Sequence, residues 1–295
     1  MCGPPRAGLG ETRMGTEAGV LYLVGTPIGN LEDITLRALR VLSEVDVVAA
    51  EDTRVTRGLL ARHGLRARLI SYHEHSGPRR AAQIVEMLRA GRRVALVSDA
   101  GMPGISDPGA RLVRACVEAG VAVTVVPGPT AVSAALALSG LPTREFLFLG
   151  FLPERAVARQ ETLRRAAGQP GAIVFFEAPH RLRESLRDVR AVLGDREAAC
   201  ARELTKQFEE VVRGRVSDLV AHFAVREPRG EMTVVLAGAQ VEKKAADLSE
   251  AVAEVRDLVA AGLSRSRAVA HVARHRGLQR RALYRAALDA GDGEP

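Results

Sequence analysis

Two carboxylates lie in a glycine- and proline-rich loop, Ser98–Gly109, that follows the short apolar run Val94–Val97. Apolar runs of this length that stop at glycine and proline are typical of buried strands. In an open parallel sheet, ligands bind outside the carboxyl ends of the strands. Asp99 comes directly after the expected strand, two residues before a glycine. We therefore expect its carboxylate to accept a hydrogen bond from a ligand ammonium group or ribose hydroxyl, rather than to serve a structural role.

Asp107, the second carboxylate, has a different expected role. It precedes Pro108, and Asp at the N-cap followed by Pro at the first helical position is a strong signal for the start of a helix. The favoured interpretation is that Asp107 caps a helix over residues 109–119. A direct role in ligand binding is the alternative.

Short apolar runs alternate with amphipathic segments from Val20 to Pro127. The expected strands cover residues 20–24, 46–50, 68–72, 93–97 and the valine-rich run before Pro127, and the expected helices cover 31–42, the segment ending at 62, 79–90 and 109–119. This alternation predicts a mostly parallel sheet with helices on both faces. The glycine-rich loop 25–30 matches neither nucleotide-binding fingerprint, but it is expected to close the same edge of the sheet as Asp99.

The pattern changes after the sequence Pro127-Gly128-Pro129. Residues 130–141 predict a buried helix, which is too short to span a bilayer. Beyond it, strands are expected at 146–149, 172–176, 198–202, 208–215 and 231–237, with helices at 154–167 and 181–193. Consecutive late strands predict a second α/β domain with antiparallel pairs. The expected organisation is a disordered leader over 1–19, one α/β domain over 20–129, another over 130–240 and a basic helical tail over 241–295.

Composition narrows the class of protein. The 295 residues are 47% hydrophobic, which is ample for packed cores, and the net charge of +7 suggests a polyanionic partner or a merely basic soluble protein. Nucleic acid is favoured over a membrane because no apolar run approaches the roughly 18 residues of a spanning helix. The three distant cysteines fit a reducing cytoplasm. The first 18 residues hold no apolar core of a signal peptide, and Met14 is an alternative start.

The last fifty residues carry a strong charge signal. Between Ser264 and Leu288 there are seven arginines and no acidic residue, although the flanking segments are acidic. Apolar spacing around Gly277 predicts a helix, a glycine turn and a second helix, which together form a small helix-turn-helix-like unit. Contact with an RNA phosphate backbone explains the missing acids, and a solvated arginine face is the alternative. The candidate RNA-binding residues are Arg265, Arg267, Arg274, Arg276, Arg280, Arg281 and Arg285.

Several long motifs resemble a single family and occur in its order. They are Gly25–Thr35, Ala50–Arg54, Ser98–Gly109, Pro127–Ala131, Phe175–Arg181, Arg202–Lys206 and Gly230-Glu231. By these motifs the chain is similar to the ribosomal RNA small subunit methyltransferase I family, in the tetrapyrrole-methylase-like class of S-adenosylmethionine enzymes. The resemblance implies two α/β domains with the methyl donor in the cleft between them. It also implies a cytoplasmic homodimer that methylates the 2′-oxygen of a cytidine in 16S ribosomal RNA.

The same resemblance implies contacts with the methyl donor, S-adenosylmethionine. They are Thr26, Pro27, Ser98, Asp99, Ala100, Gly101, Ile105 and Thr130 from the first domain, and Phe176, Glu177, Leu236 and Ala237 from the second. Methyl transfer from a sulfonium is an in-line displacement, for which the protein mainly supplies positioning and a dry cavity. That chemistry requires no metal.

A ribose hydroxyl is a poor nucleophile, so a base or a polarising cation beside it is expected to help by roughly 10²–10⁴-fold. Candidates in loops that face the cleft are Glu51, Asp52, His73, Glu74 and Lys206, with Arg54 as a phosphate clamp. Three ionisable groups crowd a strand's carboxyl end at 51–54, which favours a functional role. The alternatives are that Glu51 and Asp52 pair with Arg54 or cap the next helix, and that His73 is simply an exposed loop residue.

Three functions are compatible with the sequence. The leading one is an RNA 2′-O-methyltransferase, the second is a tetrapyrrole methyltransferase of the same fold, and the third is a non-catalytic RNA-binding module. The arginine-rich tail favours the first over the second, because a small-molecule enzyme has no use for it. The complete cleft loops argue against the third.

Overall fold

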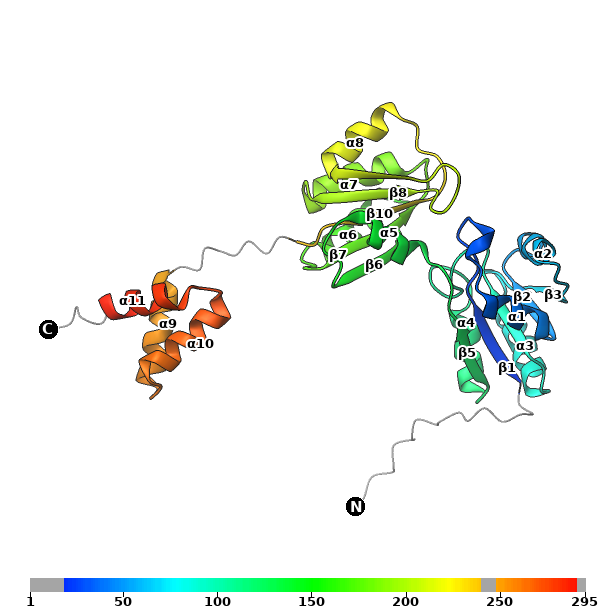
Figure 1. Ribbon diagram of the computed structural model, residues 1–295, viewed down its shortest axis with the longest axis horizontal. Coiled ribbons are helices and arrows are strands. Elements are labelled where there is room, and N and C mark those ends of the chain that lie inside the picture. Colours follow the sequence, from blue (N-terminus) through cyan, green and yellow to red (C-terminus); the bar gives the residue numbers. More distant parts are fainter. Residues whose placement is uncertain (1–18, 240–247, 291–295) are drawn as a thin grey trace, which may run out of the picture. The chain divides into compact units, whose positions relative to one another are not determined.

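The computed structural model describes residues 19–239 and 248–290, and Figure 1 traces their helices and strands. The expected disordered leader and Met14 therefore lie outside the described residues, apart from Gly19. The chain divides into two compact units, Met1–Ala239 and Gln240–Pro295. No helix in the described ranges is both long and apolar enough to cross a membrane.

The first sheet of the larger unit has five strands in the order β3-β2-β4-β1-β5. All of its pairings are parallel, which confirms the predicted mostly parallel sheet. The strands are β1 (Val20–Val24), β2 (Val47–Ala50), β3 (Leu69–Ser71), β4 (Val94–Val97) and β5 (Ala122–Val126). β2 and β4 are buried along their whole length, as expected for central strands covered on both faces.

Helices cover both faces of this sheet, as predicted. They are α1 (Leu36–Glu44), α2 (Thr53–Arg62), α3 (Pro78–Arg89) and α4 (Ala110–Glu118). Side chains of α1 and α2 pack in one core, and those of α3 and α4 pack in another. The neighbours β1 and β4 therefore continue into helices on opposite faces, which opens a crevice beyond their carboxyl ends.

The predicted helix over 31–42 is wrong in its first turns. The structure has a short 3₁₀ helix, η1 (Leu31–Asp33), and α1 begins separately after Thr35. Asn30 caps η1 by accepting from the Glu32 backbone N–H at 3.1 Å, and Thr35 caps α1 by accepting from the Ala38 backbone N–H at 3.0 Å. Two local caps therefore interrupt a run whose apolar spacing is typical of one helix.

The second sheet is mixed, with the order β6-β7-β10-β8-β9. β6 pairs with β7 in parallel, and the other pairings are antiparallel, as predicted. Its strands are β6 (Phe146–Phe151), β7 (Ala172–Glu177), β8 (Glu197–Arg202), β9 (Glu210–Arg215) and β10 (Met232–Leu236), and its helices are α5 (Ala131–Ser139), α6 (Ala156–Ala166), α7 (Leu182–Leu193) and α8 (Val216–Val225). The helix α8 lies between β9 and β10, where no helix was predicted.

The smaller unit is a three-helix arrangement of α9 (Leu248–Ala260), α10 (Arg265–Arg276) and α11 (Arg280–Asp289). Gly277 ends α10 with a φ of 66°, in the left-handed region that favours glycine at a helix end. Val255, Val269 and Leu283 come from the three helices and share one buried core. The predicted helix, glycine turn and helix are confirmed, and α9 supplies a packing partner that was not predicted.

Two glycines let the loops after β1 and β5 meet. A Cβ built on Gly25 would lie 2.7 Å from the Gly128 backbone nitrogen, and one on Gly128 would lie 3.0 Å from the Gly25 carbonyl carbon. The Gly25 backbone nitrogen also donates to the Val126 carbonyl at 2.9 Å. The loop that extends β1 is thus held against the loop that extends β5, backbone to backbone.

Replacing Gly25 by Ala is expected to destabilise the chain by about 1–3 kcal/mol, because the added methyl group overlaps the Gly128 backbone and forces a shift. Gly58 is the matched control: it lies inside α2, and an added Cβ meets nothing within 4 Å. Gly58→Ala should stabilise by up to about 1 kcal/mol, since Ala is the better helix former. Urea unfolding measures both changes, and a neutral Gly25→Ala would show that the two loops are not in contact.

Candidate functional site

Two loops are tied together at the carboxyl edge of the first sheet. The Thr26 backbone nitrogen donates to the Gly101 carbonyl at 2.9 Å, and the Gly101 nitrogen donates to the Thr26 carbonyl at 3.1 Å. The buried Thr26 hydroxyl donates to the carbonyl of Ser98, which is also buried, at 3.1 Å. Gly101 has a φ of 78°, so a side chain there would be strained. The predicted contacts Thr26, Pro27, Ser98 and Gly101 therefore do converge.

The ends of β2 and β4 are joined through carboxylates. Asp99 Oδ1 accepts from the Asp52 backbone nitrogen at 2.9 Å, and Glu51 Oε2 accepts from the Asp99 backbone nitrogen at 3.3 Å. Asp99 therefore has a structural role, which was expected to be less important than ligand contact, because its carboxylate helps to hold the start of α2. Its side chain is still exposed at the edge of the sheet, next to Ala100, so it can also meet a ligand.

Asp52 and Arg54 mainly bind each other. Asp52 is the N-cap of α2, and its Oδ2 lies 2.5 Å from an Arg54 guanidinium nitrogen. Hydrogen bonds from Arg54 lower the pKa of Asp52 to about 2. Glu51 behaves differently, because burial raises its pKa, and the charge of Asp99 raises it further. The alternative of pairing and capping is thus what the structure shows for Asp52 and Arg54.

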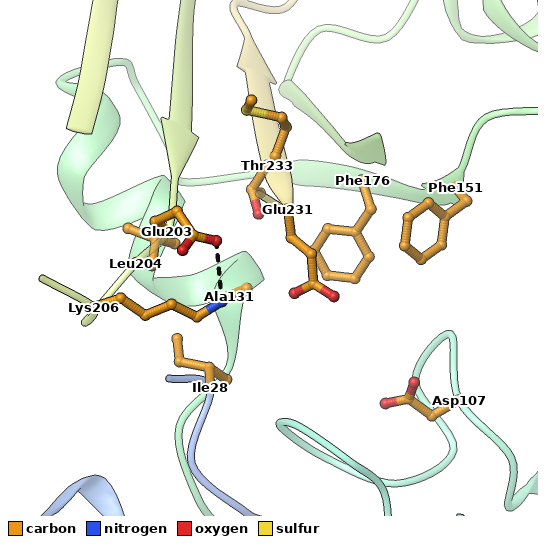
Figure 2. A pocket seen from close by; sticks show the side chains of 11 residues that line it. Ile28, Asp107, Ala131, Phe151, Phe176, Glu203, Leu204, Lys206, Glu231 and Thr233 are labelled. Carbon is orange, nitrogen blue, oxygen red and sulfur yellow. Dashed lines mark hydrogen bonds and ion pairs between the residues drawn. The ribbon is translucent and has the colours of Figure 1, made fainter. Parts of the chain in front are cut away.

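The interpretation of Asp107 as a helix cap is wrong. The helix α4 begins at Ala110, its N-cap is Gly109, and no side chain caps it. Sequence reasoning failed because Pro108 lies in a turn two residues before the helix, instead of at its first position. Asp107 is instead partly buried in a pocket (Figure 2). Burial and, next, the charge of Glu51 raise its pKa to about 7.

The pocket combines loops of the first sheet with the nearest ends of the second. Its lining residues are Ile28, Asp107, Ala131, Phe151, Phe176, Glu203, Leu204, Lys206, Glu231, Met232 and Thr233. Figure 2 shows the rings of Phe151 and Phe176 as one aromatic wall, with centroids 5.4 Å apart. Lys206 Nζ lies 3.0 Å from Glu203 Oε1. An apolar wall with a few convergent polar groups is typical of a small-molecule site.

Comparison with known proteins identifies the family to which this fold and site belong. The family described as Tetrapyrrole (Corrin/Porphyrin) Methylases matches residues 20–220. A Synechocystis protein named Ribosomal RNA small subunit methyltransferase I is 46% identical over 273 residues, which cover 92% of this chain and 98% of that protein. The Escherichia coli O157:H7 protein of the same name is 44% identical over 274 residues, with 92% and 95% covered. The chain belongs to the ribosomal RNA small subunit methyltransferase I family.

A shorter relative and two solved structures match only part of this chain. A Thermotoga maritima methyltransferase I is 50% identical over 220 residues, which cover 99% of that protein but 75% of this chain. The solved methyltransferase CobJ has a TM-score of 0.59 at 22% identity, with 75% of this chain and 95% of that one covered. A uroporphyrin-III C-methyl transferase from Thermus thermophilus, complexed with S-adenyl homocysteine, has a TM-score of 0.52 at 24% identity, with 73% and 96% covered. These two structures confirm the predicted fold.

Some residues predicted to contact the methyl donor lie apart from the pocket in this member of the family. Leu236 pairs with Ile173, whereas Met232, at the other end of β10, pairs with Glu177 and lines the pocket. Leu236 is about 13 Å along the strand from Met232, given roughly 3.3 Å per residue. Because β10 runs antiparallel to β7, its amino end meets the pocket, and its carboxyl end, with Leu236 and Ala237, lies away from it. Their contact with the methyl donor stays a prediction.

Glu177 is also committed to internal partners. Its buried carboxylate accepts from the Ser185 hydroxyl, from the Ala178 backbone nitrogen at 2.9 Å and from Arg181 Nη2 at 3.5 Å, and it forms an ion pair with Arg181. These bonds fix the turn between β7 and α7, beside Phe176. Thr130 likewise caps α5 by accepting from the Ser133 backbone nitrogen. Ile105 is exposed in the loop before Asp107.

Sequence reasoning did not assign Glu203, Leu204, Glu231, Met232 and Thr233 to the site. Gly230 offered a signal that could have found them: its φ is 73°, and a Cβ there would lie 2.1 Å from Glu203 Oε1. The glycine lets the start of β10 pack closely on the loop after β8. In an antiparallel pair, the start of one strand lies beside the end of the other.

The arginines of the smaller unit are not all equivalent. Arg276 is paired with Glu254 at 2.6 Å and with Glu250 at 3.0 Å, so it ties α10 to α9. A guanidinium in two ion pairs is a poor candidate for phosphate contact. Arg280 donates to the Ser266 hydroxyl at 3.0 Å and is exposed. Arg265, Arg267, Arg274, Arg281 and Arg285 are exposed as well.

Asp107→Asn should remove part of the pH dependence of stability. The unfolded carboxyl ionises near 3.8 and the folded one near 7, so the folded state binds the extra proton between these values. Its free energy of unfolding therefore falls as the pH rises through this window. At about pH 8 the variant should be more stable than the parent by about 1–2 kcal/mol. The difference is no larger because water still reaches part of the Asp107 side chain and screens its charge. Thermal unfolding at about pH 5 and pH 8 measures this, and an equal response of both proteins would contradict it.

Proposed function

We propose that this chain transfers the methyl group of S-adenosylmethionine to the 2′-oxygen of a cytidine in 16S ribosomal RNA of the small subunit. The observation that carries the proposal is the 46% identity with a methyltransferase I over 98% of that relative's length. The chain's own geometry supports it, because a pocket with aromatic and ionisable walls lies at the carboxyl edge of the first sheet.

The residues at this edge fit a cationic methyl donor. Glu51, Asp99 and Glu231 bring negative charge close to Asp107, and such a field favours a sulfonium and an ammonium group. The bend at Gly101, with a φ of 78°, brings the backbone close to Ile28 and Pro129 without a side chain between them. We propose that Thr26, Pro27, Ser98, Asp99, Ala100, Gly101, Ile105, Thr130 and Phe176 hold the donor, with Glu177 acting through the turn that it fixes. The bound donor supplies an electrophilic methyl group.

The chain contributes mainly position and a water-poor surface, worth up to about 7–11 kcal/mol when the geometry is good. Among the predicted catalytic residues, Lys206 lies in the pocket, oriented by Glu203. We propose that Lys206 polarises the acceptor hydroxyl. Glu51 contributes negative charge at the edge of the sheet, and Asp52 fixes the backbone there by capping α2. The exposed Arg54 binds an RNA phosphate.

The smaller unit is proposed to add RNA affinity through its exposed arginines. The Thermotoga methyltransferase I is matched over 99% of its length by 220 residues, close to the length of residues 19–239. A family member of that size has no counterpart for about a quarter of this chain. The smaller unit therefore strengthens RNA binding, and the larger unit carries the methyl transfer. We further propose that the chain works as a homodimer in the cytoplasm.

A parallel assay tests the function directly. Tritiated S-adenosylmethionine is offered with isolated small subunits, free ribosomal RNA and uroporphyrinogen. Label in the small subunits or in the free RNA is expected. Label in uroporphyrinogen alone would establish the tetrapyrrole methyltransferase instead, and donor binding without any label would favour the non-catalytic RNA-binding module.

Replacing four exposed arginines of the smaller unit by Gln should weaken RNA binding without changing donor affinity. The four are Arg265, Arg267, Arg280 and Arg281. The slope of log affinity against log salt should shrink by about 0.7–0.9 for each lost phosphate contact. Salt titrations with the small subunit measure the slope, and calorimetry measures donor affinity.

The matched control removes four positive charges from the larger unit instead, at exposed positions on or next to α6 and α7. These are Arg155, Arg165, Arg187 and Arg190. The control variant has the same net charge as the variant of the smaller unit. It should nevertheless keep the parent's salt slope if the phosphate contacts are made by the smaller unit. Equal slopes for both variants and the parent would show that the arginines of the smaller unit are only a solvated face.

A further inference from the structure

Asp107 is a pocket carboxyl to which the proposed function assigns no role. It faces the aromatic wall and Glu231 from the loop between β4 and α4 (Figure 2). The nearby Ser98 hydroxyl donates to the Ala100 carbonyl at 3.3 Å. Within residues 19–239 and 248–290, no ion pair includes Asp107. Asp52 and Glu203, by contrast, are each paired with a cation. Asp107 is thus available to accept a proton from a bound molecule.

The loop that carries Asp107 is folded back on itself. Gly109 packs against Gly104, since a Cβ on Gly109 would lie 3.0 Å from the Gly104 nitrogen. Ser106 has a φ of 62°, which is uncommon for a residue other than glycine. Its hydroxyl oxygen would lie 3.1 Å from a Cβ on Gly150 of β6. The loop is therefore turned against the second sheet, which places the next residue, Asp107, at the pocket.

The charged groups around Asp107 come from each neighbouring element. Glu51 follows β2, Asp99 follows β4 and Glu231 precedes β10, and all three raise the pKa of Asp107. Lys206 also lines the pocket, but it is paired with Glu203. Together with burial, these carboxylates bring the pKa of Asp107 to about 7. A general base works best when its pKa lies near the working pH.

We propose that Asp107 is the catalytic base that removes the proton from the ribose 2′-hydroxyl. The inference rests on the proposed function. In this step the 2′-O–H proton moves to a carboxylate oxygen of Asp107, and the 2′-oxygen forms a bond to the methyl carbon of the sulfonium donor. The carbon–sulfur bond breaks, and its electron pair stays on sulfur. The products are a methyl ether, a neutral thioether and the Asp107 carboxylic acid, which returns its proton to solvent.

Glu51 is the competing carboxylate, and the geometry favours Asp107 over it. Glu51 accepts a hydrogen bond from the Asp99 backbone nitrogen and does not line the pocket. Its charge acts on Asp107 from outside the pocket. We therefore assign Glu51 the role of a positioning residue that sets the field around Asp107.

The first test is Asp107→Asn in the full chain, with methylation of small subunits followed across pH. The expected loss in kcat is roughly 10²–10⁴-fold, with unchanged affinity for the donor and for the small subunit. The parent's rate should rise with pH to a plateau with a midpoint near 7, and this rise should be absent in the variant. Asp257→Asn makes the same chemical change in α9 and should behave as the parent.

The second test separates the two carboxylates. In Glu51→Gln the rise should persist but move to lower pH, because one of the charges that disfavour ionisation of Asp107 is gone. Carbon-13 NMR of labelled aspartate carboxyls gives a readout independent of activity: a resonance that titrates near pH 7 should vanish in Asp107→Asn and titrate lower in Glu51→Gln.

Several outcomes would overturn the assignment. They are an Asp107→Asn variant with the parent's rate and pH profile, a Glu51→Gln variant that loses the rise altogether, or the lack of a shifted aspartate resonance in the parent. The last two apply even if Asp107→Asn fails to fold. A parent that does not methylate small subunits or ribosomal RNA at all would instead contradict the proposed function, while the NMR titration would still report on Asp107.

Discussion

The backbones of Gly25 and Gly128 touch, and this contact sets the distance between the loops that follow β1 and β5. The loop after β4 is bonded to the first of these through Thr26 and Gly101, so three loops share one rigid edge. Asn30 then donates from its backbone nitrogen to the Thr205 hydroxyl at 2.9 Å, which joins this edge to the second sheet. The absence of side chains at Gly25 and Gly128 lets the loops approach closely, and the side chains of neighbouring residues such as Ile28 and Asp107 line the pocket.

Charge is divided along the chain in a way that suits two different partners. Carboxylates gather at the edge of the first sheet, where Glu51 and Asp99 raise the pKa of Asp107. Exposed arginines gather in the smaller unit, where, within the described residues 248–290, Arg276 is the one of the seven that is held in ion pairs with α9. A cationic methyl donor and a polyanionic RNA require these opposite environments. Because the two lie on different parts of the chain, each can be altered without the other.

The sequence predicted the elements whose causes are local. Buried apolar runs marked β2 and β4, and Gly277 marked the end of α10, because burial and backbone conformation constrain the residues directly. Predictions failed where the cause was non-local. Asp107 and Pro108 have the residue types of a helix start, but α4 begins only at Ala110, because Gly109 packs against Gly104 in the preceding turn. Leu236 lies in a correctly predicted strand, but which end of β10 meets the pocket could not be predicted, because the direction of β10 depends on its pairing with β7. The motifs, in turn, identified the family without indicating which of their side chains face the pocket.

A crystal structure of the chain with S-adenosylhomocysteine measures most directly whether this pocket is the methyl-donor site. We expect the ligand to contact Thr26, Gly101 and Phe176, with its sulfur on the side of the pocket that Asp107 faces. Density for the ligand at the Leu236 end of β10, or on the smaller unit, would contradict the assignment of the pocket and of every residue role built on it.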